Sequence, residues 1–395
     1  MGSRILFLSI PASGHVFPTI SIVDELVKRR NEVHYTAVGQ HAETIAETGA
    51  TVISYDSVDP VSVVTSDDSG RAPLAFLQEN IAMLGAIESH FGENPPDLIA
   101  YDGVAAQAGR VLAKKWDRPA VQLSPVFASN EHYSFVEKMM EAAGPVDTAN
   151  PAMAGFGRLL GELLASNGLE VSIPEFMQAT ENLNIVFVPR EFQPMGETFD
   201  ERFVFVGPCL GERAFLGEWE PPQDDRPLVL VSLGTVNNRD ASFFGRCVEA
   251  FGDLPWRVVI SVGGGIDPAT LGPLPDNVEV HRFIPHLKVL EHASAAVIHG
   301  GMGTLMETLH FGCPTVVVPP FPDVIPNADR VAELKLGIAL RPDDLTPERL
   351  RAALLEVVED RTVLERLAEM RAHTRAAGGA VRAADEIEAY LGRIG

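Results

Sequence analysis

Short apolar runs alternate with longer amphipathic stretches along most of the chain. In the first half, runs of strand length occupy residues 5–10, 32–37, 51–55, 97–101, 120–123, 184–188 and 203–206. Helical periodicity lies between most of these runs, at residues 17–27, 42–48, 73–90 and 105–115. Strands that alternate with helices at such short spacing favour a parallel, doubly wound sheet. We expect residues 56–71 to form a loop, and residues 127–182 to form mobile helices that hold a variable substrate.

The same alternation begins again near residue 228. Residues 208–226, just before it, are rich in Pro, Gly and acidic side chains, which predicts a linker. Strand-like runs then come at 228–233, 256–261, 278–283, 295–298 and 315–318, and helical patterns at 243–251, 305–311, 346–377 and 380–391. The predicted fold class is α/β, with two doubly wound domains (1–207 and 227–378) that face each other across a cleft. We expect residues 379–395 to form a C-terminal helix that packs back on the first domain.

Composition and charge argue against several kinds of partner. The formal net charge is −23, whereas a nucleic-acid backbone or an anionic membrane surface attracts clustered Lys and Arg. An anionic substrate therefore needs a local site made of helix ends and a few cations or imidazoles. Cys209, Cys247 and Cys313 are far apart and odd in number, which predicts neither a disulfide framework nor a metal site. The first apolar run is too short for a signal sequence or a membrane span, so we expect a cytoplasmic protein.

Residues 297–327 carry the most informative local pattern. A buried strand ends at Ile298, a glycine-rich turn occupies 299–304, and Gly312 and Pro314 end the helix that follows. Glycines let the backbone approach an anion, and the free N–H groups at a helix start carry partial positive charge. A phosphate is therefore the expected ligand. Many α/β proteins use such a turn only to reverse the chain, and this stretch alone leaves both alternatives open.

Two side chains at strand ends in the first half could form a general base. His15 follows the first strand, and Asp102 ends the strand at 97–101. Strand ends of one parallel sheet point into one crevice, where an Asp could hold one ring nitrogen of a His and stabilise the charged imidazole. The alternatives are a capping or loop histidine and a turn or N-cap aspartate.

Polar residues around the glycine turn also have two interpretations each. Thr304 and Glu307 have the spacing of a capping box, while Glu307 could instead accept a hydrogen bond from a sugar hydroxyl. His299 is either a phosphate donor or a strand-end histidine bonded to backbone. Asp323 and Asn327 lie in a Pro-rich loop, where they either bind hydroxyls or are solvated. No D-x-D pair occurs in the chain, so the usual metal-bridged diphosphate has no candidate ligands.

These motifs together resemble family 1 glycosyltransferases, the GT-B enzymes that use nucleotide sugars. The plant signature runs W-x-x-Q, then H-C-G-W-N-S-x-x-E, then D-Q before an N; within residues 283–327 the matching segments read FIPH, HGGMGTLME, and DV before an N. PASGHVFP resembles the family's GH-x-x-P element, and AYDG matches the position of its partner Asp. SNEHYSF, PREFQPMGETFDERFVFVGP and VSLGT are most similar to bacterial macrolide and enediyne antibiotic glycosyltransferases, including the calicheamicin type. The resemblance covers essentially the whole chain.

The resemblance implies a role for each matching residue. His15 is expected to be the catalytic base and Asp102 its partner. The nucleotide sugar is expected to contact Gly14, Thr235, Phe283, Ile284, His286, His299, Gly301, Met302, Gly303, Thr304, Glu307, Asp323 and Val324. Acceptor contacts are expected from Phe76, Phe127, Asn130, His132 and Phe135. No cofactor or metal is implied, because the nucleotide diphosphate sugar is a co-substrate held by helix ends and side-chain donors.

Three departures from the family pattern bear on the sugar. Phe283 replaces a Trp that stacks the base, His286 replaces a Gln, and Val324 replaces a Gln that binds glucose hydroxyls. A site without that polar contact discriminates less between sugars, so a TDP-deoxysugar and UDP-glucose are both candidate donors. The expected reaction is inverting transfer to a hydroxyl of a hydrophobic natural product such as a polyketide, macrolide or enediyne. The alternatives are a nucleotide-sugar epimerase and a non-catalytic partner of the same fold, and the oligomeric state, monomer or homodimer, stays open.

Overall fold

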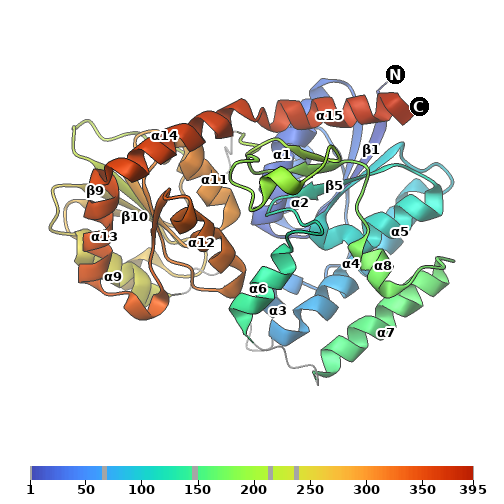
Figure 1. The fold of residues 1–395 in the computed structure, drawn as a ribbon, viewed down its shortest axis with the longest axis horizontal. Helices are drawn as coiled ribbons and strands as arrows, with labels where there is room; N and C mark the ends of the chain where they lie inside the picture. The colour runs from blue at the N-terminus through green and yellow to red at the C-terminus, as the bar shows by residue number, and fades with distance from the viewer. Residues whose placement is uncertain (1, 65–68, 145–149, 212–216, 235–239, 395) are drawn as a thin grey trace.

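The computed structural model describes residues 2–64, 69–144, 150–211, 217–234 and 240–394. The chain folds into two α/β halves that lie side by side, and the last helix returns from the second half to the first (Figure 1). Each half is built on one parallel sheet with helices around it. The predicted α/β class with two doubly wound domains is therefore confirmed.

The first sheet has seven strands in the order β3-β2-β1-β4-β5-β6-β7. Its strands are β1 Arg4–Leu8, β2 Glu32–Thr36, β3 Thr51–Ile53, β4 Leu98–Asp102, β5 Ala120–Ser124, β6 Asn184–Val186 and β7 Phe203–Phe205. The neighbours β1 and β4 place Leu8 opposite Tyr101, and both strands are almost wholly buried because helices cover the sheet. Their carboxyl ends meet at one edge, so the segments that follow these two strands start close together.

The helices of the first half are α1 Ser13–Lys28, α2 Gln40–Glu47, α3 Pro60–Val64, α4 Ala72–Phe91, α5 Ala106–Trp116, α6 Phe135–Ala143, α7 Pro151–Ser166 and α8 Ile173–Gln178. The loop predicted at 56–71 was wrong, because this stretch contains α3 and the 3-10 turn η1 Ser69–Arg71. Pro60 is the first residue of α3, where its fixed φ suits a helix start and its missing N–H is not needed. The polar residues around it concealed that signal.

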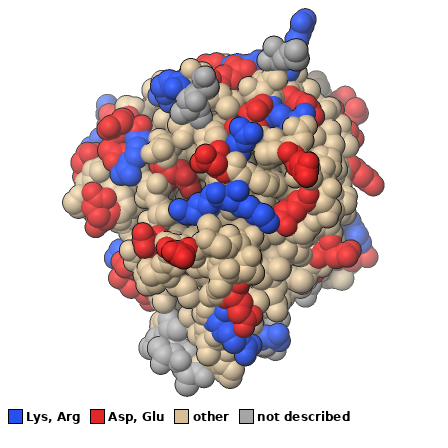
Figure 2. Space-filling model, turned by 90° about the vertical axis from the view of Figure 1, so that its right-hand side faces the viewer, with Lys and Arg blue, Asp and Glu red and all other residues tan. Residues whose placement is uncertain are grey.

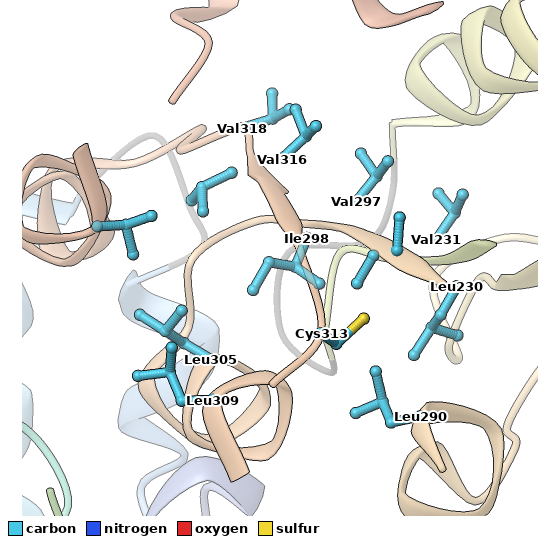
Figure 3. Packing of buried hydrophobic residues seen from close by; sticks show 14 of the residues in the cluster. Leu230, Val231, Leu290, Val297, Ile298, Leu305, Leu309, Cys313, Val316 and Val318 are labelled. Carbon is cyan, nitrogen blue, oxygen red and sulfur yellow. The ribbon is translucent and has the colours of Figure 1, made fainter. Parts of the chain in front are cut away.

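The second sheet has six strands in the order β10-β9-β8-β11-β12-β13. They are β8 Leu228–Ser232, β9 Arg257–Ser261, β10 Val278–His281, β11 Ala295–Ile298, β12 Thr315–Val317 and β13 Gly337–Ala339. Figure 3 shows Ile298 of β11 against Leu305 and Leu309 of helix α11 (Met302–Phe311), with Cys313 in the same cluster. Burial raises the pKa of the Cys313 thiol to about 12, so this cysteine is a core residue rather than a reactive thiol.

The other helices of the second half are α9 Ala241–Phe251, α10 His286–Leu290, α12 Ile325–Glu333, α13 Pro347–Glu359 and α14 Arg361–Ala376. The single helix predicted over 346–377 was wrong, because Asp360 ends α13 with extended backbone and starts α14. Its carboxylate accepts hydrogen bonds from the N–H groups of Thr362 and Val363, at 2.8 and 3.3 Å. An N-cap aspartate thus interrupts a stretch whose periodicity alone looked continuous.

Helix α15 (Gly379–Ile394) returns to the first half and packs along α1. Its buried residues join the core of the first sheet, and Arg29, the C-cap residue of α1, forms ion pairs with Asp385 and Glu388 at 2.6 and 2.9 Å. The two places where the chain passes between the halves are in contact, because the N–H of Gly379 donates to the carbonyl of Val206 at 2.7 Å. The chain therefore passes in both directions between the halves at one place.

No helix in the described part of the chain is long and apolar enough to cross a bilayer. On the face drawn in Figure 2, groups of acidic side chains are scattered over a largely uncharged surface, and Lys and Arg form a short stripe near the centre and smaller groups elsewhere. This distribution agrees with the net charge of −23.

Candidate active site

The first turn of α1 and the end of β4 bring His15 and Asp102 together. His15 Nδ1 lies 2.8 Å from Asp102 Oδ2, and the other carboxylate oxygen, Oδ1, accepts the N–H of Val104 at 2.9 Å. The Asp102 side chain is only 1% exposed, whereas that of His15 is 24% exposed. The pairing expected from strand-end positions is present, with the carboxylate fixed and the imidazole open to solvent on one side.

The surroundings of His15 favour its charged form. Burial lowers the pKa of His15, but the charge of Asp102, its hydrogen bond and the charge of Asp323 outweigh burial and raise the pKa above its usual value. Because Asp102 holds Nδ1, Nε2 is the nitrogen that can take a proton from a bound group. This is the arrangement of a histidine general base.

Asp323 approaches this pair from the second half of the chain. It lies on the 3-10 turn η6 (Pro322–Val324), which packs against α6 of the first half. Desolvation raises the pKa of Asp323, while backbone N–H groups and the charge of His15 partly offset that rise. Since His15 and Asp323 each perturb the pKa of the other, the residue predicted at the sugar and the predicted base belong to one electrostatic site.

Glycines make room for the His299 imidazole. A Cβ on Gly234, after β8, would lie 2.5 Å from His299 Cε1, and a Cβ on Gly301 would lie 2.3 Å from His299 Nε2. Gly234 and Gly300 also have φ of +76° and +89°, a region that suits glycine. Burial, together with the charge of His286, lowers the pKa of His299 to about 4, while a hydrogen bond with the Ser232 backbone opposes this fall. At neutral pH His299 is therefore an uncharged ring with a single N–H, which the Ser232 backbone can accept.

The start of α11 differs from the predicted capping box. The helix begins at Met302, with Gly301 as its N-cap, and within the described residues no side-chain hydrogen bond caps this end. Thr304 is thus the third helical residue and Glu307 lies in mid-helix, so the capping interpretation was wrong. No described atom lies within 4 Å of a Cβ placed on Gly303, in the first turn. Gly303 is exposed, so there is room for an anion beside the N–H groups at this helix start.

Glu307 and His286 form a partly buried pair beside the turn. Glu307 is 2% exposed, and its Oε2 lies 3.7 Å from His286 Nδ1 at the start of α10. Phe283, three residues earlier, is 50% exposed. An exposed ring beside a buried carboxylate suits the base and ribose roles that the resemblance implied, which remain predictions.

Several residues predicted to contact the nucleotide sugar have their side chains in the core. Ile284, Met302 and Val324 are 2–6% exposed, so they can meet a ligand chiefly through backbone atoms. The Val324 side chain lies beneath the turn, with its Cβ 3.7 Å from a Cβ placed on Gly300. Gly14 is exposed, with open space beside it. Thr235 lies outside the described residues.

The residues predicted to contact the acceptor fall into two groups. Phe127 is buried against Phe192 and Tyr133 in the core, and Asn130 fixes a turn by accepting the N–H groups of residues 132 and 133 at 2.9 Å. The structure thus gives these two residues packing and folding roles. His132 is exposed, while Phe76 and Phe135 are half-buried and keep part of their rings accessible.

Two functional candidates were misjudged or missed. Asn327 was expected in a loop but lies in α12, where its Nδ2 donates to the carbonyl of Gly300 at 2.8 Å and is buried. The sequence signal was Pro326, which belongs in a helical first turn rather than a loop. Arg330, one turn later, was not singled out, since a single arginine in a helix carries no distinguishing pattern.

Comparison with known proteins agrees with this geometry. Residues 246–389 match the family described as erythromycin biosynthesis protein CIII-like, C-terminal domain. NDP-glycosyltransferase YjiC of Bacillus licheniformis is 38% identical, over all of both chains. This chain belongs to the GT-B glycosyltransferases. Demethyllactenocin mycarosyltransferase of Streptomyces fradiae is also similar to this glycosyltransferase, 39% identical over 98% of this chain and 87% of the relative.

A solved structure has the same fold as this glycosyltransferase. The crystal structure of CalG4, the calicheamicin glycosyltransferase, superposes with a TM-score of 0.89 and 42% identity, over 100% of this chain and 99% of CalG4. The resemblance to macrolide and enediyne glycosyltransferases inferred from the sequence motifs is confirmed.

Proposed function

We propose that this glycosyltransferase moves a sugar, with inversion, from a nucleotide diphosphate sugar to a hydroxyl of a hydrophobic natural product, without a metal ion. One observation carries the proposal: His15 and Asp102 form a 2.8 Å pair whose imidazole keeps access to solvent and whose pKa responds to Asp323 of the opposite half. A base at this junction stands between an acceptor held by the first half and a donor held by the second.

The reaction is a single displacement. The acceptor hydroxyl gives its proton to His15 Nε2 as its oxygen forms a bond to the anomeric carbon. The bond from that carbon to the diphosphate oxygen breaks on the opposite side, and the nucleoside diphosphate leaves with the electron pair. Asp102 stabilises the imidazolium formed in this step, because its carboxylate accepts the Nδ1 hydrogen.

The leaving diphosphate is stabilised by donors of the second half. The single N–H of the neutral His299 ring can pass from the Ser232 backbone to the diphosphate, and the first turn of α11 offers backbone N–H groups beside Gly303. A preorganised donor of this kind is worth roughly 3–4 kcal/mol in the transition state. No group of three or more metal-binding side chains occurs within the described residues, and the full sequence contains no D-x-D pair. In this proposal, these donors therefore stabilise the negative charge of the diphosphate in place of a metal ion.

Asp323 and Val324 argue for a sugar poor in hydroxyls. Asp323 is the accessible carboxylate of this loop and can accept bonds from sugar hydroxyls, whereas Val324 is buried and apolar. We therefore propose a TDP-deoxysugar as the preferred donor and UDP-glucose as the second candidate. The relative from Streptomyces fradiae is named as a mycarosyltransferase, which is consistent with this order.

The acceptor proposal rests on apolar side chains that the first half leaves exposed. Val136 and Met140 of α6 and Met177 of α8 are exposed, and α6 borders the turn that carries Asp323. Methionine adapts its shape to bulky apolar partners. A macrolide or another polyketide suits such a surface better than a small polar acceptor.

A turnover screen tests the proposal. The protein is incubated with UDP-glucose or with TDP-activated deoxysugars, each with oleandomycin or 4-methylumbelliferone, and the products are weighed by mass spectrometry. The acceptor mass should increase by one sugar in the wild-type protein and not in His15→Ala. A changed sugar nucleotide without acceptor mass would identify an epimerase, and no turnover in any combination would reject the transferase.

A further inference from the structure

Helix α12 touches both halves of the molecule. At its start, Asn327 Nδ2 donates to the carbonyl of Gly300 at 2.8 Å, inside the glycine turn. One turn later, Arg330 reaches the first half and donates to three successive backbone carbonyls, those of residues 191–193, at 3.1, 2.9 and 3.2 Å. Its remaining contact, at 2.9 Å, is to Glu333 of its own helix.

The segment that Arg330 holds is itself tied to the acceptor side. Gln193 is buried, and its amide makes two bonds to one residue: Oε1 accepts the N–H of Ala128 at 2.9 Å, and Nε2 donates to the Ala128 carbonyl at 3.2 Å. Ala128 belongs to the loop between β5 and α6, where Asn130 fixes the backbone of residues 132 and 133. We call residues 127–133 the acceptor loop.

A second link joins Arg330 to this loop. Burial raises the pKa of Tyr133 to about 12, and the charge of Arg330 opposes that rise, so the phenol of the acceptor loop lies within the electrostatic reach of the guanidinium. Helix α6, which follows the loop directly, also packs against both η6 and α12. The nucleotide-binding half thus reaches both the acceptor loop, through Arg330, and the helix that follows it, through η6 and α12.

We infer that Arg330 is a positioning residue, and that α12 couples the glycine turn to the acceptor loop. The path runs from the Gly300 carbonyl through Asn327 along one helical turn to Arg330, then through residues 191–193 and Gln193 to Ala128. A diphosphate that orders the glycine turn therefore also orders the loop beside the acceptor. This inference rests on the proposed function, because it assigns donor and acceptor to the two ends of the path.

Arg190 provides a matched control. It also donates to three backbone carbonyls, of Gly196, Phe199 and Phe203 at 2.7, 3.1 and 3.2 Å, but all of them belong to the first half. Arg330→Lys and Arg190→Lys each keep the charge and lose the fork that spans several carbonyls. Only the first of these changes interrupts the path between the halves.

Hydrogen exchange of the acceptor-loop amides tests the coupling directly. Saturating UDP or TDP should slow exchange in residues 127–133 at least about fivefold in the wild-type protein and in Arg190→Lys, and less than about twofold in Arg330→Lys. Affinity for UDP or TDP in Arg330→Lys should stay within about threefold of wild type. Equal protection in Arg330→Lys and Arg190→Lys, or no protection in the wild-type protein, would overturn the inference.

Turnover gives a second readout that loss of stability alone would not move. With the acceptor that the wild-type protein glycosylates fastest, Arg330→Lys should raise the ratio of sugar-nucleotide hydrolysis to transfer at least about fivefold, because water then competes with a poorly placed acceptor. An unchanged ratio in Arg330→Lys refutes the positioning role. A wild-type protein that protects the loop but transfers no sugar would refute the proposed function and leave the coupling standing.

Discussion

Replacement of Asp102 by Asn isolates the contribution of the carboxylate charge to the base. The side chain keeps its size, but the anion 2.8 Å from His15 Nδ1 is lost. Two unit charges about 4 Å apart interact by about 4 kcal/mol at an effective dielectric constant of about 20, which corresponds to about a thousandfold in rate. Because the imidazole is 24% exposed, solvent screens part of this energy, and we expect kcat to fall about 10²- to 10³-fold.

The pH dependence of the transfer rate tests the role of Asp102 more specifically than the fall in kcat does. Asp102 raises the pKa of His15, so the acidic limb of the wild-type profile should lie above the usual histidine pKa, and in Asp102→Asn it should move to lower pH. A raised pKa also stabilises the fold below the unfolded-state pKa of histidine, about 6.5, and this stability is lost as pH rises through the folded-state pKa. Asp102→Asn should therefore lose more stability at pH 5.5 than at pH 8.5.

Initial rates of transfer between pH 5 and 9, with thermal unfolding at the two ends, check both expectations. Asp97→Asn is the matched control, because Asp97 precedes the same strand at its other end and accepts only the N–H of Arg4 at 2.8 Å among the described contacts. A kcat of Asp102→Asn within about threefold of wild type, or an unshifted acidic limb, would refute the role assigned to the pair.

Three further substitutions test the nucleotide site and the crossing. His299→Ala should lower kcat about 10²- to 10³-fold in the transfer assay, since it removes one donor to the leaving group, and a rate near wild type would argue against that role. Gly303→Ala should raise the free energy of unfolding by about 0.4–1 kcal/mol, because the site is helical and open, yet weaken UDP or TDP in calorimetric titrations; unchanged affinity would place the phosphates elsewhere. Gly207→Ala should destabilise the protein by about 1–3 kcal/mol in denaturant unfolding, because φ is +68° and the new Cβ would lie 2.8 Å from Ala377 Cβ; stability equal to wild type would show that the crossing relaxes.

Sequence patterns predicted those features that depend on strand order and spacing. The meeting of His15 and Asp102 followed from the rule that parallel strands end at one edge, and the glycine turn followed from its place between a strand and a helix. The resemblance of the motifs to a known family supplied the expected reaction, glycosyl transfer from a nucleotide sugar. These inferences needed no knowledge of individual contacts.

Features decided by single side-chain contacts were not predictable in the same way. The break at Asp360 depends on one carboxylate turning back to two N–H groups, within a stretch whose apolar period continues across it. The start of α11 at Met302 depends on backbone geometry at Gly301 rather than on the capping spacing of Thr304. Phe127 was expected to contact the acceptor, and its burial depends on Phe192, which is far away in sequence. Arg330 acts across the two halves, and its partners are carbonyls that any residue would supply.

The return of α15 to the first half has a consequence for biosynthesis. Ala383, Ala384, Ile387 and Tyr390 belong to the same buried cluster as Ile5 and Phe7 of β1. The half that leaves the ribosome first therefore exposes an apolar face until α15 has been added, whereas the second half can close its own core earlier. A nascent chain stalled or truncated before residue 380 would present that uncovered face to chaperones and proteases. Helix α15 thus completes the core of the half that is synthesised first.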